Sequence, residues 1–433
     1  MSKIRIVGDA SGYVELSAQN AAGNNTLELP SGSTKLVGSD NSGNIVVGVV
    51  TATSIAGVTT AGITTAYIGA INDGPISGVR NRIINGDCRI DQRNNGASAQ
   101  ATDGGYFIDR WSTILNAGNF SVQGNAGNVT PPVGFTSYFG ATVTTAAGTT
   151  PPGGTSGIRY KVEGSNISDF AWGTSNAKTV TMSFWARSTG LTYPANFGGA
   201  IWNSDQTFSY PFLYTIPSSG TWTYITITIP GSTQGTWLST NGVGMGIDFS
   251  MGTATAQQGT AGAWTSGYKQ GATGQVHHLN TNGSTLYLTG LQLEEGKVAT
   301  PFEYRSYGQE LALCQRYCYV ISNSGNSPYD GYTMISLGHS VSTTNVYGMV
   351  TLPVTMRTPP TFSNLGSDAS PLYWTDWTGA SVTGLTINEM YGWDNTRGRI
   401  RLDKSAGYTA QRAGFIWFDG TKSNQRIAFN AEL

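Results

Sequence analysis

The chain has 433 residues, and its 24 Lys and Arg against 25 Asp and Glu give a formal net charge of −1. A protein that binds nucleic acid carries a basic surface to neutralise phosphates, so this balance, with only 11% charged residues, argues against such a partner. Glycine supplies 58 residues, nearly twice the usual share of roughly 7%. Together with abundant Thr, Ser and Asn, this composition predicts a protein rich in strands and turns.

The chain also shows no sign of a membrane or disulfide-stapled protein. No apolar run approaches the ~20 residues that a membrane helix requires, and the start MSKIRIVGDA lacks the apolar centre of a signal peptide. The three cysteines, Cys88, Cys314 and Cys318, are too few and odd in number for a disulfide framework. We therefore expect synthesis in the cytosol, no membrane insertion, and stability that comes from packing or assembly.

The first segment, residues 1–79, is predicted to be small, β-rich and dependent on other copies. It contains only two aromatic residues, Tyr13 and Tyr67, too few for a self-sufficient core. Its strand-like pieces are KIRIVG, YVELSA, TLELP and NIVVGVV, separated by turns rich in Gly, Asn and Asp. The repeat GVTTAGITTA at 57–66 predicts a slender shaft of three copies, with a flexible Gly/Thr linker as the alternative.

The second segment, residues 80–305, predicts an antiparallel β-sandwich. From Thr179 to Arg187 the apolar residues alternate with Thr181, Ser183 and Trp185, and Thr221 to Pro230 alternates Ile with Thr. Gly, Pro, Asn and Ser punctuate these runs. We assign Trp111 and Trp185 to the sandwich core. Four further tryptophans are candidates to line a concave face: Trp202, Trp222, Trp237 and Trp264. The alternative is that the whole module is a spacer and that binding is confined to the distal tip.

A single helix is expected at 306–318. Ser306 followed by Gln309 has the spacing of a capping box. Leu311, Cys314 and Cys318 then form an apolar stripe, which either meets its copies at a threefold axis or packs on the chain's own sandwich. Leu311, Cys314 and Cys318 are thus the candidate trimer interface.

The last segment, residues 319–433, predicts a second β-domain. Strand patterns occur at Val346 to Thr355, Phe415 to Asp419 and Arg426 to Leu433. The last of these places Ile427 and Phe429 on one face, which suggests that this strand is tied into a sheet.

The sequence contains few signs of a catalytic or metal-binding motif. Neither GxxxxGK[ST] nor GxSxG is present, and Gly242, Gly244 and Gly246 read as a strand rather than a phosphate-binding loop. His277 and His278 are adjacent and cannot chelate one metal from one strand, and His339 stands alone. Asp and Asn in DNSGN at 40–44 are too few for a twelve-residue calcium loop, so an Asx turn is favoured. We expect no metal and no cofactor.

A pair of carboxylates is the remaining feature that would indicate an enzyme, because glycosidases place two carboxyl groups on either side of the scissile bond. Glu294 and Glu295 are adjacent at a strand end and are expected to be solvated. The candidate carboxylates are Asp103, Asp109, Asp169, Asp205, Asp248, Glu294, Glu295, Glu303, Asp376 and Asp394. Because the sequence pairs none of them, we expect a protein that is not an enzyme.

Aromatic residues in turn-rich segments are the candidate ligand-binding residues, because exposed rings stack on sugar faces. The candidates are Tyr329, Tyr332, Tyr373, Trp374, Asp376 and Trp377. The alternative is that some of these side chains fill the core of the last domain or a trimer interface.

Two long strings carry a resemblance to a known family. RIINGDCRIDQR at 82–93, followed by Asp109-Arg110-Trp111, and LYLTGLQLEEGKVATPFEYRSY at 286–307, followed by ELALCQRY, resemble a module of phage tail fibres and other virion fibre proteins. The resemblance spans about 80–318 and implies a jelly-roll sandwich similar to carbohydrate-binding modules. LPVTMRTPPTF at 352–362 and AFNAEL at 428–433 look like the distal domain that follows it, and the opening is similar to structural proteins of phages of cyanobacteria.

The resemblance and the patterns together predict an all-β protein of four parts. These are an N-terminal virion-attachment and shaft segment (1–79), a jelly-roll carbohydrate-binding-like module (80–305), a connecting helix (306–318) and a distal β-sandwich domain (319–433) that is expected to be the receptor-binding tip. The implied function is that of a homotrimeric tail fibre that docks on other tail or neck proteins and adheres to a host surface glycan or lipopolysaccharide. A head or neck fibre or decoration protein, and a polysaccharide depolymerase, are the alternatives. The missing signal peptide disfavours a secreted bacterial carbohydrate-binding protein.

Overall fold

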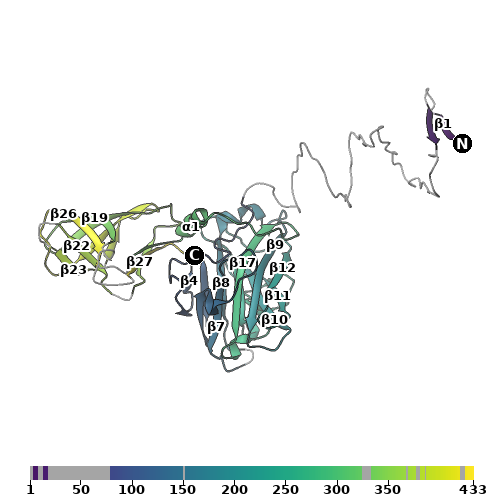
Figure 1. The fold of residues 1–433 in the computed structure, drawn as a ribbon, viewed down its shortest axis with the longest axis horizontal. Coiled ribbons are helices and arrows are strands. Elements are labelled where there is room, and N and C mark those ends of the chain that lie inside the picture. Colours follow the sequence, from purple (N-terminus) through teal and green to yellow (C-terminus); the bar gives the residue numbers. More distant parts are fainter. Residues whose placement is uncertain are drawn as a thin grey trace. The chain divides into compact units, whose positions relative to one another are not determined.

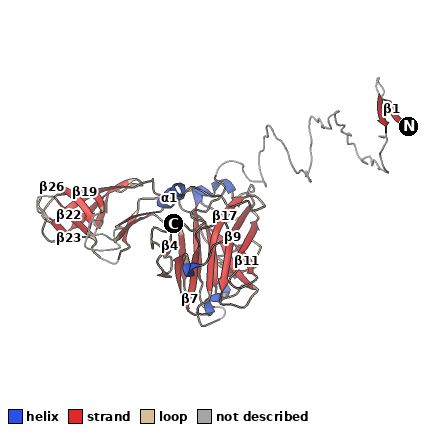
Figure 2. Cartoon of the chain, in the orientation of Figure 1, coloured by secondary structure: helices blue, strands red, loops and turns tan. Residues whose placement is uncertain are grey.

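The computed structural model describes residues 3–7, 13–17, 79–149, 152–323, 333–366, 369–376, 381–385, 387–419 and 425–433. The chain divides into two compact units, Met1–Tyr67 and Ile68–Leu433. Strands dominate the described residues, which contain one α-helix together with short 3-10 turns (Figures 1 and 2). The expectation of an all-β protein with one short helix is confirmed.

In the first unit, β1 (Lys3–Val7) pairs antiparallel with β2 (Tyr13–Ser17). This hairpin confirms the first two strands expected from the sequence. The other two strand-like pieces, the turn at 40–44 and the repeat at 57–66 lie outside the described residues.

The central domain is an antiparallel sandwich of two sheets. One sheet has the order β15 (Thr265–Ser266), β11 (Phe208–Ile216), β10 (Ala195–Asn203), β13 (Val243–Gly252), β8 (Ser156–Glu163), β5 (Trp111–Leu115) and β4 (Tyr106–Ile108). The other has the order β12 (Thr223–Ile229), β9 (Val180–Thr189), β17 (Thr285–Glu295), β7 (Phe139–Thr145), β6 (Asn119–Gly124) and β3 (Ala99–Gln100). A short parallel pair, β14 (Gln258–Gly259) and β16 (Gly271–Ala272), accompanies them. The 3-10 turns are η1 (Ala126–Asn128), η2 (Gly164–Asn166), η3 (Ser168–Phe170), η4 (Thr255–Gln257) and η5 (His278–Asn280).

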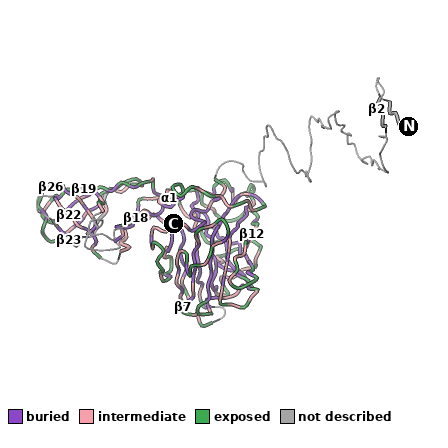
Figure 3. Tube along the Cα trace, in the orientation of Figure 1, coloured by how far each residue is buried: buried purple, intermediate pink, exposed green. Residues whose placement is uncertain are grey.

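The core of this sandwich follows the predicted alternation. Met182 and Phe184 of β9 and Ile229 of β12 are fully buried, and one continuous apolar cluster draws on both sheets (Figure 3). Trp111 lies at its centre, with its ring 4.8 Å from that of Phe139. The core assignment of Trp111 is therefore confirmed.

Trp185, in contrast, was assigned to the core wrongly. It alternates with buried Met182, Phe184 and Ala186 along β9 and is only partly buried on the opposite face. The reason is the period of two in a strand, which sends neighbouring side chains to opposite faces of the sheet.

The connecting helix α1 (Tyr307–Gln315) begins where the capping signal placed it. The side chain of Ser306 accepts a hydrogen bond from the backbone N–H of Gln309, and the side-chain oxygen of Gln309 accepts one from the backbone N–H of Ser306. The helix is shorter than the expected 306–318, because residues from Cys318 onward form strand β18 (Cys318–Ser322), which pairs with β27 (Arg426–Asn430). The run CYVIS contains residues that favour strands, and it begins where the last helical turn was expected.

The candidate trimer-interface residues pack inside the chain. Cys314 is fully buried in a small cluster with Ile84, Ile90 and Tyr317, against which Leu311 lies partly buried. Cys318 is also fully buried. This packing corresponds to the alternative in which the stripe covers the chain's own sandwich. All three cysteines are free thiols, as expected.

The distal domain is a second β-sandwich. A three-stranded sheet has the order β18, β27 (Arg426–Asn430) and β21 (Thr361–Asn364). A seven-stranded sheet has the order β23 (Ser381–Leu385), β22 (Leu372–Thr375), β26 (Arg412–Phe418), β19 (Met334–Ser340), β20 (Asn345–Thr351), β25 (Arg397–Asp403) and β24 (Ile387–Tyr391). Ile427 and Phe429 are buried in its core, which confirms that the last strand is tied into a sheet. No helix within the described ranges has the length and apolar character needed to cross a membrane.

A buried ionic cluster joins the distal and central domains. Glu432 pairs with Arg93 of the central domain at 2.9 Å and also with Arg110, whose side chain is 1% exposed. The Arg357 guanidinium donates to the main-chain oxygen of Glu432 at 2.6 Å. Because removing a buried charge from water is costly, each of these guanidiniums depends on its partner.

Candidate functional site

A groove with a volume of about 470 Å³ lies on the outer face of the six-stranded central sheet. It is lined by Phe135, Ser183, Trp185, Tyr224, Gly290, Ala299, Thr300, Pro301, Phe302 and Tyr304. Strands β9, β12 and β17 form its floor, and the segment after β17 forms one side.

The floor carries two neighbouring aromatic rings. Trp185 on β9 stands directly opposite Tyr224 on β12, and the ring centroids are 5.2 Å apart. Tyr224 is 44% exposed on β12, the edge strand of this sheet. Both rings therefore present apolar surface to whatever enters the groove.

Three further rings form the side wall. Phe135 packs against Phe302 at 5.1 Å and against Tyr304 at 5.6 Å. The Tyr304 hydroxyl donates to the carbonyl of Gly134 at 2.8 Å, and yet this residue remains 54% exposed. The ring is thus fixed in place while one side stays accessible.

A glycine makes this wall possible. Gly290 has φ +66° at the irregularity in β17, and a Cβ there would lie 2.6 Å from Cζ of Phe135. Only glycine tolerates this backbone and also leaves room for the ring.

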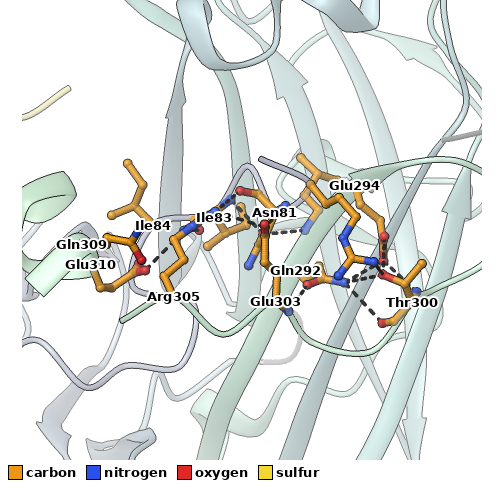
Figure 4. A network of polar contacts seen from close by, with 12 residues as sticks. Asn81, Ile83, Ile84, Gln292, Glu294, Thr300, Glu303, Arg305, Gln309 and Glu310 are labelled. Carbon is orange, nitrogen blue, oxygen red and sulfur yellow. Dashed lines mark hydrogen bonds and ion pairs between the residues drawn. The ribbon is translucent and has the colours of Figure 1, made fainter. Parts of the chain in front are cut away.

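A polar network behind the wall holds the segment that carries it (Figure 4). Glu294 accepts hydrogen bonds from the backbone of Thr300 at 2.8 Å, from its hydroxyl at 2.6 Å, and from Gln292 at 2.7 Å. Glu294 is 2% exposed, so the expectation that it is solvated is wrong. Its neighbour Glu295 pairs with Lys178 at 2.9 Å. The Glu294 carboxylate can be buried because the segment that follows β17 covers it and supplies hydrogen-bond donors.

The same network reaches the start of the domain. The backbone of Asn81 donates to Glu303 at 2.7 Å, and Arg305 donates to the carbonyl of Ile83 at 3.0 Å and pairs with Glu310 at 3.3 Å (Figure 4). The two sequence strings at 82–93 and 286–307 therefore meet, and several of their polar residues position the wall of the groove.

The groove itself is uncharged. None of its lining residues within the described ranges carries an ionisable acid or base other than a tyrosine. Ser183 and Thr300 bring hydroxyl groups to it. Aromatic faces beside a few hydroxyls bind ligands that offer C–H surfaces and hydrogen-bonding groups together.

Other candidate carboxylates are engaged in structural contacts away from the groove. Asp248 pairs with Arg159 at 2.8 Å. Asp109 accepts hydrogen bonds from the backbone and side chain of Gln92 at 2.7 and 2.6 Å, and burial raises its pKa to about 6. Asp169 pairs with Arg82 at 2.6 Å. Asp394 accepts the backbone N–H groups of a turn.

The predicted ligand-binding residues of the distal domain are only partly within the described residues. Tyr329, Tyr332 and Trp377 lie outside them. Tyr373 is partly buried on β22, and Asp376 is 7% exposed. Trp374 is fully buried and packs edge-on against Tyr408 at 5.5 Å, so its ring is a core side chain, as the alternative interpretation held.

The four tryptophans considered for a concave face do not share one. Trp202 is 2% exposed beneath the guanidinium of Arg159. Trp237 and Trp264 pack edge to face at 5.6 Å, each also against Trp172. Trp222 packs against Tyr138 at 5.7 Å. The positions of these tryptophans in the sequence do not predict which residues each ring contacts.

Two further motif interpretations can be compared with the packing. Gly244 and Gly246 lie in β13, where a Cβ at Gly246 would collide with the Trp202 ring at 2.0 Å, and Gly242 directly precedes this strand. His278 is fully buried beside Phe197, and burial lowers its pKa to about 3. His278 is therefore a core residue of the central domain.

Sequence reasoning missed the groove, although two signals for it exist. Trp185 sits on the polar side of a strict alternation, where a large ring must lie on the outer face. Phe302 and Tyr304 follow a proline directly after a long strand, as an exposed aromatic pair would. Neither signal locates Phe135, which lies more than a hundred residues earlier in the chain.

The central domain is thus a β-sandwich with an aromatic groove on the outer face of one sheet. No family model and no curated protein matches the sequence. Among solved structures the chain is distantly similar to the protein titled "CBM4 structure and function", with 16% identity, coverage of 49% of this chain and 97% of that one, and a TM-score of 0.24. The family 11 carbohydrate-binding module from Clostridium thermocellum, solved with a mixed-linked tetrasaccharide, has 13% identity, coverage of 47% and 98%, and a TM-score of 0.23.

A domain of a phage protein is also among the structures with distant similarity. The enzymatically active domain of bacteriophage CBA120 tailspike protein 4 has 12% identity and a TM-score of 0.26. The alignment covers 50% of this chain and only 21% of the tailspike chain. These similarities concern the fold at a distance, and the functional argument rests on the groove.

Proposed function

We propose that this chain is a structural protein of a virion fibre that adheres to a host surface glycan through the aromatic groove of its central domain. The observation that carries the proposal is the set of exposed, fixed rings on an uncharged sheet face, with Tyr224 44% and Tyr304 54% exposed. Large exposed aromatic patches mark binding sites rather than ordinary surface.

The chemistry of the groove fits a saccharide. Pyranose rings offer C–H faces that pack on Trp185 and Tyr224, while their hydroxyls meet Ser183 and Thr300 at the edge. The wall is held in place before any ligand arrives, by the hydroxyl of Tyr304 and by Glu294 behind it. A fixed wall reduces the entropy lost on binding.

The groove favours binding over hydrolysis. Glycoside hydrolysis requires two carboxyl groups roughly 5–9.5 Å apart across the bond, and no carboxyl group lines this groove within the described ranges. We therefore propose an adhesin without catalytic activity. A depolymerase would need a site elsewhere on the chain.

The assembly and location are part of the same proposal. The strings at 82–93 and 286–307 resemble virion fibre modules, and the repeat at 57–66 is suited to a shaft shared by three copies. Three copies on one fibre would convert weak binding at each groove into strong adhesion, because the second and third contacts are intramolecular. Docking on tail or neck proteins through residues 1–79 follows from this arrangement. A head or neck fibre would differ in its place on the virion, not in this chemistry.

A pair of tyrosines three positions apart tests the groove. Tyr304→Ala removes a wall ring, whereas Tyr307→Ala removes an equally exposed ring (58%) at the start of α1, which does not line the groove. On an array of bacterial surface polysaccharides, followed by titration of the best neutral polysaccharide, we expect Tyr304→Ala to lose about tenfold in affinity. Tyr307→Ala should bind as the wild type does.

The proposal fails if the wild-type protein binds no polysaccharide, or if the two variants lose affinity equally. Assaying the same samples for newly released reducing ends separates binding from hydrolysis. Release of sugar by the wild type would favour the depolymerase instead.

A further inference from the structure

The outward face of β9 continues from the groove to an arginine. Trp185 and Arg187 are two positions apart on this strand, so they share a face and lie about 7 Å apart along it. Trp185 is opposite Tyr224 of β12. Arg187 is opposite Tyr287 of β17. The aromatic floor of the groove therefore ends beside a positive charge.

The Arg187 guanidinium is held in place by neutral groups. Its Nε donates a hydrogen bond to the carbonyl of Gly220 at 2.9 Å, in the turn that precedes β12. Its central carbon lies over the ring of Tyr287, 4.9 Å from the centroid. That ring packs edge-on against Tyr138 and Trp222, at 5.9 and 6.4 Å. These contacts fix the side chain without neutralising its charge.

Arg187 has no acidic partner in the part of the chain that the structure describes. Among these residues it makes no ion pair, and its two Nη nitrogens donate no hydrogen bond to a protein group. The two nitrogens are also not enclosed, in contrast to Nε of the buried Arg110. Arg159 of the same domain, by comparison, pairs with Asp248 at 2.8 Å. Arg187 thus keeps N–H donors for an anion from outside the chain.

Two acids close to the groove do not compensate this arginine. Glu294 is in register with a position of β9 that is six residues, about 20 Å, from Arg187. Asp87 acts electrostatically on Tyr304 of the groove wall, and it pairs with Arg89 at 2.8 Å. Neither carboxylate therefore cancels the charge at the end of the floor.

We propose that the groove prefers an acidic polysaccharide, whose carboxylate or sulfate group binds Arg187 while the adjacent sugar packs on Trp185 and Tyr224. This preference rests on the proposed function and adds a substrate class to it. A guanidinium matches both anions through its N–H donors. A single arginine among neutral rings suits one negative charge for each sugar unit better than the double charge of a phosphate monoester. A neutral glycan would use the rings alone.

The test uses the full chain and probes that differ in charge. Polygalacturonate is compared with its methyl ester, in which the same sugar carries no charge, and dextran sulfate is compared with dextran. By titration at low salt, we expect wild type to bind the charged member of at least one pair about tenfold more tightly than the neutral member. This preference should shrink as salt is raised.

Variants of Arg187 assign the preference to this side chain. Arg187→Gln should abolish it. Arg187→Lys keeps the charge but loses the paired donors, and should reduce the preference to about threefold. The Lys variant carries the test if a melting curve shows that the Gln variant does not fold. Arg412→Gln is the matched control, because it removes an exposed arginine on β26 of the distal domain and should keep the full preference.

Tighter binding of polygalacturonate than of its ester would identify a carboxylate group, and tighter binding of dextran sulfate than of dextran a sulfate group. Three results would overturn the assignment to Arg187: no preference in either pair, an unchanged preference in the folded Arg187 variants, or an equal loss in Arg412→Gln. The last would indicate attraction to overall charge. The groove itself is tested by Tyr304→Ala on a neutral polysaccharide, so loss of the preference alone leaves the proposed function standing.

Discussion

The central groove and the distal face, which is the outward side of β19, β20 and β25, are built on the same plan and differ in chemistry. Each is the outward side of an antiparallel sheet whose inward side fills a sandwich core. In the groove, the outward positions carry rings such as Trp185 and Tyr224, and on the distal face they carry Leu337, Met349 and Arg399. The comparison teaches that a strand leaves its outward residues free to vary, so one architecture can present an aromatic face and a face of aliphatic and arginine side chains.

The two faces also differ in how they are supported. The wall of the groove is a loop segment held by buried polar groups, with Glu294 and Arg305 among them. The distal face is formed by the strands themselves, held by backbone pairing of β19, β20 and β25. Disturbing interior polar groups should therefore affect the groove more than the distal face.

The largest effect is expected where the two domains join. Glu432→Gln would leave Arg93 and Arg110, 8% and 1% exposed, without their carboxylate. Since breaking a buried ion pair leaves an uncompensated charge, we expect the free energy of unfolding to fall by about 3–5 kcal/mol. Denaturant unfolding followed by tryptophan fluorescence measures this loss, and a second transition would show that the domains had separated.

Glu295→Gln is the matched control for this change. Its partner Lys178 is 43% exposed, so the pair should contribute less than about 1 kcal/mol. Equal destabilisation by the two substitutions would show that the junction cluster has no special role.

Acid should act on the central domain through His278. Its pKa is about 3 in the folded chain because it is buried, against an ordinary value near 6.5. Below pH 6.5 the unfolded chain binds a proton that the folded chain does not, so stability falls as the pH is lowered, by up to about 1.4 kcal/mol per pH unit. Asp109 acts in the opposite direction, because its raised pKa of about 6 costs stability as the pH rises from 3.8.

Replacing the histidine separates these contributions. His278→Leu should flatten the fall of the melting temperature between pH 7 and pH 5, measured by scanning calorimetry, whereas the half-buried His277→Leu should change it less. A slope in His278→Leu equal to that of the wild type would assign the acid sensitivity to other groups.

The smallest of the three effects is expected at Gly290. An alanine there would place Cβ 2.6 Å from the Phe135 ring at φ +66°, and we expect a loss of about 1–3 kcal/mol together with weaker glycan binding. Gly283→Ala is the control, because it has φ +77° but no atom within 4 Å of the added methyl group. The difference between the two in denaturant unfolding isolates the clash. If Gly290→Ala kept full binding, the position of Phe135 would not matter to the groove.

Several elements could be predicted from the sequence because their signals are local. The alternation in β9 and β12 and the capping pair Ser306 and Gln309 are predicted by the sequence, as are free rather than disulfide-bonded cysteines. Each depends on residues a few positions apart, whose geometry is set by the strand or helix period.

Other residues were misplaced because tertiary contacts decide their surroundings. Glu294 was expected to be solvated, but Thr300 and Gln292 donate hydrogen bonds to its carboxylate and the returning chain buries it. Cys318 fits the apolar stripe of the helix, but it pairs with Asn430 of β27 in a sheet. Trp374, chosen as an exposed ring, lies on the inward side of β22. A periodicity argument describes neither side-chain hydrogen bonds nor pairing with a strand that is distant in the sequence.

The sequence by itself determined that this is an all-β chain with a helix between two strand-rich domains, because hydrophobic period, turn residues and caps act over short distances. Only the tertiary structure decided which outward face became the candidate site. The groove wall depends on contacts such as Asn81 with Glu303, 222 positions apart, and on Phe135 reaching Gly290. Such contacts form only when the two sheets close around a shared core, and no local pattern encodes them.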